Sequence, residues 1–179
     1  MFQHLFFKSR GGIALDTLHH LRDEAFIGAL TACDSTELKL ASMLFGRARQ
    51  LFKCVLEFDH QSQPELHSQI AHSTYANCNL MTDHLHRAIA SKCQLPRDAI
   101  IVDAPPAKLE VQFDVNVISG GDRMSSLTEL SPVVKTLATE QFDKFVKKVR
   151  VFVHPEYIEA LPSHPELYAL LTAATAASR

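Results

Sequence analysis

Residues 46–59 read GRARQLFKCVLEFD, and the pattern of apolar residues changes within this stretch. Upstream, apolar residues recur near helical spacing from Leu38 to Ala48. From Leu51 onward the residues are mostly apolar until Asp59, which is typical of a short strand. The stretch therefore predicts the point at which a helical region ends and a sheet begins.

The same stretch carries three cations, Arg47, Arg49 and Lys53. One interpretation is that a helix ends in basic residues because they favour the negative end of its dipole. The other is that the cations bind an anion. With 46% hydrophobic residues, 21% charged residues and a net charge of -2, the 179-residue chain is typical of a globular protein and lacks the bulk positive charge of non-specific nucleic-acid binders. Any anion must therefore be bound by a local cluster.

Downstream, the pattern predicts further strands and two long helices. A helix is expected from 64 to about 93, a strand in 98–106, a strand in 109–121, a helix in 131–149 and a strand in 149–155. Together with the first strand, this order is that of the ferredoxin-like βαββαβ arrangement, in which two helices cover one face of a four-stranded antiparallel sheet.

The first 50 residues predict a helical layer in front of this lobe. A helix over residues 2–20 is weakened by Gly11 and Gly12, which mark a bend or a close approach. Either Asp34 or Ser35 is expected to cap a later helix.

The fold is therefore expected to be α+β, with a helical segment at 1–50 and an α+β C-terminal lobe at 51–179. The chain contains neither a signal peptide pattern nor a run of about 18 apolar residues. We therefore expect a cytoplasmic protein without membrane contact.

Metal binding has little support in the sequence. The four cysteines, Cys33, Cys54, Cys78 and Cys93, include no CxxC pair and are expected to be reduced thiols. The histidines also lack the helical spacing of a ligand set. No cofactor or metal is expected in this chain.

A motif in the opening stretch leads to a family. The family pattern is a short D-x-x-F-L-x-x-L helix, a charged helix and then R-x-L-F-K leading into a strand. Residues 23–59 follow it, with Ile27 at the first leucine position and Arg49, Leu51, Phe52 and Lys53 matching the last part. This resembles the region after the catalytic helices in HD-superfamily phosphohydrolases, specifically the sterile-alpha-motif/HD-domain-like deoxynucleoside triphosphate triphosphohydrolases. The stretches 6–18, 100–106 and 140–157 also resemble parts of that family, so the resemblance covers most of the chain.

The resemblance implies a regulatory nucleotide site between subunits. Its phosphate-binding positions correspond to Arg10, Arg49 and Lys53, while Ser9 replaces a histidine and His154 replaces a lysine found in some relatives. Guanidinium groups bind phosphate bidentately, and ammonium groups act as point charges. Our hypothesis is that these residues converge on the phosphates of GTP or a dNTP accompanied by Mg²⁺. The alternative is that they are solvated cations at helix ends.

Catalysis in that superfamily requires a divalent metal held by an H…HD…D signature. This chain contains no His-Asp dipeptide, and Phe7 replaces a tyrosine that lines the substrate pocket in relatives. The resemblance therefore implies a lobe that is inactive by itself, with the metal on a preceding HD half. We expect a regulatory and homo-oligomerisation lobe. The alternative is a free-standing protein-interaction module that has lost the nucleotide site.

Overall fold

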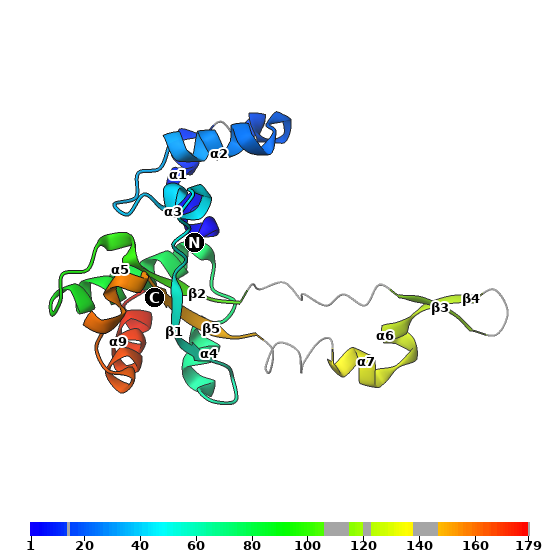
Figure 1. Cartoon of the computed structure of the whole chain (residues 1–179). Helices are drawn as coiled ribbons and strands as arrows, with labels where there is room; N and C mark the ends of the chain where they lie inside the picture. Colours follow the sequence, from blue (N-terminus) through cyan, green and yellow to red (C-terminus); the bar gives the residue numbers. More distant parts are fainter. Residues whose placement is uncertain (14, 106–114, 120–122, 138–146, 179) are drawn as a thin grey trace. The chain divides into compact units, whose positions relative to one another are not determined.

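Helices and strands are both present in the computed structural model, which describes residues 1–13, 15–105, 115–119, 123–137 and 147–178 (Figure 1). The expected α+β class is therefore confirmed. The chain divides into two compact units. Unit 1 comprises Met1–Leu56, Asn79–Val102 and Val151–Arg179, and unit 2 comprises Glu57–Cys78 and Asp103–Arg150. The functional division at residue 50 stays a prediction.

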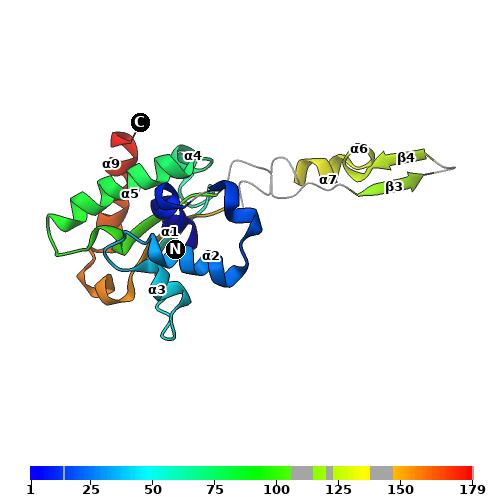
Figure 2. The ribbon, with the colours of Figure 1, turned by 90° about the horizontal axis from the view of Figure 1, so that it is seen from above.

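The N-terminal part of unit 1 is helical. Its elements are α1 (Phe2–Ser9), the 3-10 helices η1 (Arg10–Gly12) and η2 (Leu15–His20), α2 (Asp23–Ala32) and α3 (Leu40–Phe45). Helices α1, α2 and α3 contact one another (Figure 2). Leu5, Leu30 and Leu40, one from each of these helices, are fully buried in their shared apolar core. Burial of this kind is what stabilises helices as short as these.

The helix expected over residues 2–20 is interrupted around the glycine pair. A Cβ added at Gly12 would lie 2.9 Å from Sγ of Cys33, whose thiol donates a hydrogen bond to the Gly12 carbonyl oxygen at 3.2 Å. At Gly11 a Cβ would meet nothing within 4 Å. The predicted close approach is thus confirmed at Gly12, where the chain passes the end of α2.

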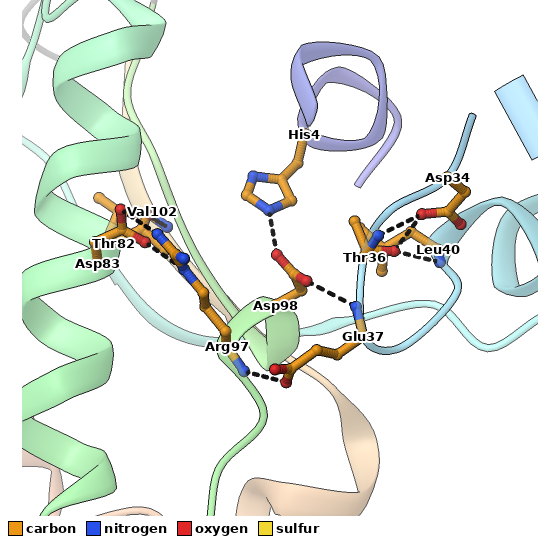
Figure 3. Close-up of polar contacts among 10 residues, drawn as sticks. All are labelled: His4, Asp34, Thr36, Glu37, Leu40, Thr82, Asp83, Arg97, Asp98 and Val102. Atoms are coloured by element: carbon orange, nitrogen blue, oxygen red, sulfur yellow. Dashed lines mark hydrogen bonds and ion pairs between the residues drawn. The ribbon is translucent and has the colours of Figure 1, made fainter. Parts of the chain in front are cut away.

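Asp34 organises the turn between α2 and α3. Its carboxylate accepts a hydrogen bond from the backbone N–H of Thr36 at 2.9 Å (Figure 3). It also accepts the backbone N–H of Ala41 at 2.8 Å. Lys39, just before α3, has the left-handed φ of 54°. The N-cap of α3 is Lys39, which makes no side-chain capping hydrogen bond, so the prediction of Asp34 or Ser35 as the cap is wrong. Asp34 instead reaches the first turn of α3 from the preceding turn through the Ala41 N–H, and α3 begins only at Leu40 and is shorter than expected.

The main sheet has three strands in the order β1-β5-β2. They are β1 (Lys53–Phe58), β5 (Val149–Val153) and β2 (Ile100–Asp103). Valines 149, 151 and 153 are fully buried, as a half-buried strand with period two requires. The Phe52 ring, just before β1 begins, contacts the His154 ring, just after β5 ends. The backbone N–H of His154 donates to the carbonyl oxygen of Ala99, just before β2 begins, at 2.8 Å. Both outer strands are therefore antiparallel to β5.

The expected four-stranded ferredoxin-like sheet is wrong. The strand predicted in 109–121 appears, within the described residues, as β3 (Asn116–Ser119), which pairs antiparallel with β4 (Arg123–Ser126) in a separate sheet. The remainder of that predicted strand lies outside the described residues. Pairing two strands that are three residues apart closes a much smaller loop than joining a distant sheet, so the local pair has the lower entropic cost.

The helix expected from 64 to 93 is two helices, α4 (Pro64–Ile70) and α5 (Tyr75–Ala90). They are separated at His72, which has a left-handed φ of 66° and donates its backbone N–H to the Pro105 carbonyl oxygen at 3.2 Å. Leu85 and Ile89 are buried as predicted, but Leu80 is exposed.

Shorter helices complete the fold. They are η3 (Arg97–Ala99), α6 (Leu127–Leu130), α7 (Pro132–Thr136), η5 (Pro155–Ala160) and α9 (His164–Ala177). A capping box at Ser126 and Glu129 starts α6, and α7 begins at Pro132 as predicted. The rest of the helix predicted in 131–149 falls largely on residues 138–146, which lie outside the described part of the chain.

Candidate functional site

The segment between α3 and β1 presents the basic residues that the sequence singled out. Gly46 ends α3, and its N–H donates to the Ser42 carbonyl oxygen at 2.8 Å. Arg47, Arg49 and Lys53 follow, and all three are exposed. None of them forms an ion pair or a hydrogen bond through its side chain with another residue that the structure describes. Three cations are thus available to an external anion within seven residues.

Phe52 fixes the start of β1. Its side chain is buried, and its backbone N–H donates to Sδ of Met1 at 3.1 Å. The ring meets the His154 ring edge-on, with centroids 5.8 Å apart. Lys53 follows Phe52 directly, and no contact between its side chain and His154 is present among the described residues.

His154 is buried, unlike the three cations. Its Nδ1 accepts a hydrogen bond from the Glu156 N–H at 3.3 Å and so caps η5, which requires the ring proton to be on Nε2 in the neutral form. The ring also contacts Tyr157, with centroids 5.5 Å apart. This imidazole therefore has a structural role at the end of β5, in addition to any contact with a ligand.

Arg10 lies at the start of η1 and is exposed. Its guanidinium carbon lies 4.1 Å from the centre of the Phe7 ring, a cation–π geometry. Among the described residues, no contact places Arg10 beside Arg49, Lys53 or His154, so their convergence stays a prediction. The neighbouring Ser9 is buried, and its hydroxyl has no hydrogen-bond partner within the described part of the chain.

A buried polar network in unit 1 was not anticipated from the sequence. Nε2 of His4 lies 3.3 Å from Oδ1 of Asp98, and Oδ2 of Asp98 accepts the Glu37 N–H at 3.0 Å (Figure 3). Burial alone would raise the pKa of Asp98, but these two interactions outweigh it and hold that pKa below its ordinary value. The network joins α1, η3 and the turn before α3.

The adjacent Arg97 extends this network to α5. Its guanidinium makes a bidentate pair with Asp83, at 3.3 Å from Nε and 3.1 Å from Nη2, and its backbone N–H donates to Glu37 at 3.0 Å (Figure 3). The hydrogen bonds and charge of Asp83 raise the pKa of Arg97. This arginine is thus committed to a protein partner, whereas Arg49 and Lys53 are not.

The described residues contain no cluster of side chains suited to metal or thiol chemistry. No group of three or more His, Cys, Asp or Glu side chains there could hold a metal ion. The four cysteines are free thiols, of which Cys78 is buried and Cys54 is exposed. Burial, with a smaller contribution from the charge of Asp103, raises the pKa of Cys78 to about 11. None of the helices in the described part of the chain has the length and apolar character that a bilayer crossing requires.

The family model described as HD associated region matches residues 4–176, nearly the whole chain. The chain therefore belongs to the HD associated region family. Comparisons with curated proteins and with solved structures give no match.

Proposed function

We propose that this chain is an accessory lobe of an HD-type deoxynucleoside triphosphate phosphohydrolase and binds nucleotide phosphates at the start of β1. The family match over residues 4–176 carries the proposal. Hydrolysis then belongs to an HD domain, whose H…HD…D residues hold the divalent metal. The ligand of the lobe is GTP or a dNTP with Mg²⁺, and its role is regulatory.

Arg49 and Lys53 are the central phosphate ligands in this proposal. Both are exposed and have no ion-pair partner among the described residues. By contrast, Lys148 just before β5 and Arg150 within β5 are both paired with Glu57, and those pairs already neutralise their charge. A phosphate gains charge-assisted hydrogen bonds most readily from cations that give up no other partner.

Arg10 and His154 have supporting roles. Arg10 supplies a second guanidinium, and its stacking on Phe7 limits the rotamers of the side chain. His154 packs against Phe52 and thereby holds the strand that carries Lys53. Because its Nδ1 already accepts the Glu156 N–H, the role proposed for His154 is to position the strand.

Association with the HD domain requires a surface, and α1, α2 and α3 provide one. We call Phe2, Phe6, Phe26 and Phe45 the N-terminal aromatic patch. Phe2 meets Phe26 and Phe45 with centroids 6.3 and 6.4 Å apart, and Phe2 and Phe45 are exposed. Phe2, Phe6 and Phe26 line a pocket of about 400 Å³ together with Leu18, Leu21 and Asp23.

The HD domain is the occupant that we propose for this patch. The patch lies within the first 50 residues, the segment that resembles the end of the HD-family helical region. Exposed aromatic side chains beside a pocket are typical anchors of protein interfaces. A single carboxylate, Asp23, at the edge of the pocket favours a partner surface that places a basic side chain next to its apolar contact.

Calorimetric titration of the full chain with GTP and with dGTP, each with Mg²⁺, tests nucleotide binding. We expect Arg49→Ala and Lys53→Ala each to weaken binding by about tenfold to a hundredfold, because a charge-assisted hydrogen bond contributes about 1.5–3 kcal/mol. Arg87→Ala removes an equally exposed cation from α5 and should leave binding unchanged. Binding that is absent, or that is unaffected in both β1 variants, rejects the nucleotide site and favours the interaction module.

Association is tested by capturing partners of the tagged full chain and identifying them by mass spectrometry. We expect a chain with an H…HD…D signature, retained by the wild type and by Ile158→Ser but lost by Phe2→Ser. Ile158 is an exposed apolar residue of η5 outside the patch, so it is the matched control. Capture of chains without that signature would contradict the HD partner.

A further inference from the structure

Arg47 is the cation between α3 and β1 that the proposed function leaves without a role. It is exposed, and its side chain forms neither an ion pair nor a hydrogen bond with another residue that the structure describes. It lies two positions from Arg49, so the two Cα atoms are at most about 7 Å apart. Because each guanidinium presents a planar fork of N–H donors, two arginines this close can bind neighbouring phosphates of one ligand.

The segment around Arg47 is strongly basic, although the chain as a whole is slightly acidic. Residues 38–56 contain four cations, Lys39, Arg47, Arg49 and Lys53, and no Asp or Glu, whereas the net charge of the whole chain is -2. The ammonium group of Lys39 donates to a backbone carbonyl oxygen at 3.2 Å. The other three cations have no such partner in the described part of the chain, so the local potential attracts anions that carry several charges.

Two hydrogen bonds close the loop that carries Arg47. One joins the Gln50 N–H to the Met43 carbonyl oxygen at 3.2 Å, and the other holds Gly46 at the end of α3. Met43 and Phe52, on either side of the loop, are buried in one apolar core. The loop is therefore held in place before a ligand arrives, which lowers the entropic cost of binding.

We propose that Arg47, Arg49 and Lys53 together bind a linear triphosphate, and that Arg47 makes the site specific for this length of phosphate chain. This inference rests on the proposed function and names what its site recognises. Each added phosphate brings negative charge and strong acceptor oxygens, so a third cation contributes only when the ligand is long enough to reach it. The triphosphate is either part of a nucleotide or the inorganic ion, because both present the same chain of phosphates.

A short, dense anion suits this segment better than a nucleic-acid strand does. The chain lacks the bulk positive charge that non-specific nucleic-acid binders use. The three cations without a described partner are instead gathered within seven residues, whereas a nucleic-acid strand spreads its phosphates along its length. A triphosphate places its phosphates next to one another, so neighbouring cations can each reach one of them.

Calorimetric titrations of the full chain with GTP, GDP and inorganic triphosphate, each with Mg²⁺ at one ionic strength, test the inference. We expect GDP to bind at least about tenfold more weakly than GTP, and inorganic triphosphate to bind within about tenfold of GTP. Arg47→Ala should weaken binding of GTP and of inorganic triphosphate by about tenfold and binding of GDP by less than about threefold. The variant therefore loses most of the preference for GTP over GDP.

Two further variants separate a specific contact from a general change of charge. Arg47→Lys keeps the charge without the planar fork, so it should recover part of the preference for GTP. Arg87→Ala, which removes an equally exposed cation from α5, should leave all three affinities unchanged. Far-UV circular dichroism checks folding, which we expect to be unaffected because Arg47 is exposed.

The outcomes separate this inference from the proposed function. Equal affinities for GTP and GDP, or GTP binding that Arg47→Ala leaves unchanged, would overturn the inference and leave a nucleotide site at Arg49 and Lys53 standing. Binding of inorganic triphosphate without binding of GTP or dGTP would support the inference and reject the nucleotide as ligand. An oligothymidylate that binds more tightly than inorganic triphosphate, and more weakly to Arg47→Ala, would assign the segment to nucleic acid and overturn the inference. No binding of any of these ligands would reject both proposals.

Discussion

Nε2 of His4 lies 3.3 Å from Oδ1 of Asp98, and the two side chains are 2% and 7% exposed. The second carboxylate oxygen of Asp98 accepts the N–H of Glu37, so one buried carboxylate connects three separate parts of unit 1. These contacts span 94 and 61 positions of sequence. The helical N-terminal segment is therefore tied to the residues before β2 by a polar contact as well as by its apolar core.

Replacing Asp98 by alanine should destabilise the fold strongly. The substitution removes the carboxylate that contacts the buried His4 ring and accepts the part-buried Glu37 N–H, and removing one member of a buried pair typically costs about 3–5 kcal/mol. Urea denaturation of the full chain measures the free energy of unfolding. Glu159→Ala, at an exposed position of η5, should change it by less than about 0.5 kcal/mol. A loss below about 1 kcal/mol in Asp98→Ala would show that the pair contributes little.

The same carboxylate should make stability depend on acid pH. Burial alone would raise the pKa of Asp98, but the contacts with His4 and Glu37 lower it below its ordinary value. A carboxyl of this kind contributes stability that is fully present above its unfolded pKa of about 3.9 and is lost as the pH falls through its folded pKa. The difference in unfolding free energy between wild type and Asp98→Asn should therefore shrink below about pH 4. A difference that stays constant with pH would contradict this assignment.

Elements with a local apolar period were predictable from the sequence. Leu85 and Ile89 lie four positions apart on α5 and are buried, and the alternation from Val149 to Val153 gives β5. The break before α5 was not predictable, because His72 is a non-glycine residue with a left-handed φ. The prediction of a fourth strand in the main sheet was wrong for a different reason. The apolar pattern of a strand does not specify which other strand it pairs with.

The candidate site was predictable only in its exposed part. Arg49 and Lys53 can be recognised in the sequence because the exposure of their side chains depends mainly on the residues next to them in the chain. The burial of His154 depends on the rings of Phe52 and Tyr157, which are brought together by the fold. Asp98 likewise acquires its partners from distant segments, so no local spacing could have indicated it.

Gly46 should be intolerant of any side chain. A Cβ at this position would lie 2.3 Å from the Ser42 carbonyl oxygen, and backbone must shift to accept it. We expect Gly46→Ala to lower the free energy of unfolding by about 1–3 kcal/mol, as overpacked sites do. Gly11→Ala is the matched control, because nothing lies within 4 Å of its added Cβ. Thermal unfolding compares the two variants, and equal midpoints would show that the end of α3 adapts freely.

Thiol labelling should distinguish Cys78 from Cys54 by their environments. Burial, reinforced by the charge of Asp103, raises the pKa of Cys78 to about 11, so the reactive thiolate is scarce near pH 8. Cys54 is exposed at the second position of β1. With a limiting amount of iodoacetamide at pH 8, mass spectrometry should find label on Cys54 and not on Cys78, and urea should equalise the labelling of the two thiols.

A Cys54→Ser chain is the control and should leave Cys78 unlabelled in the folded state. Rapid labelling of Cys78 without urea would mean that its surroundings open readily and that the contacts around the start of α5 are weaker than their burial implies.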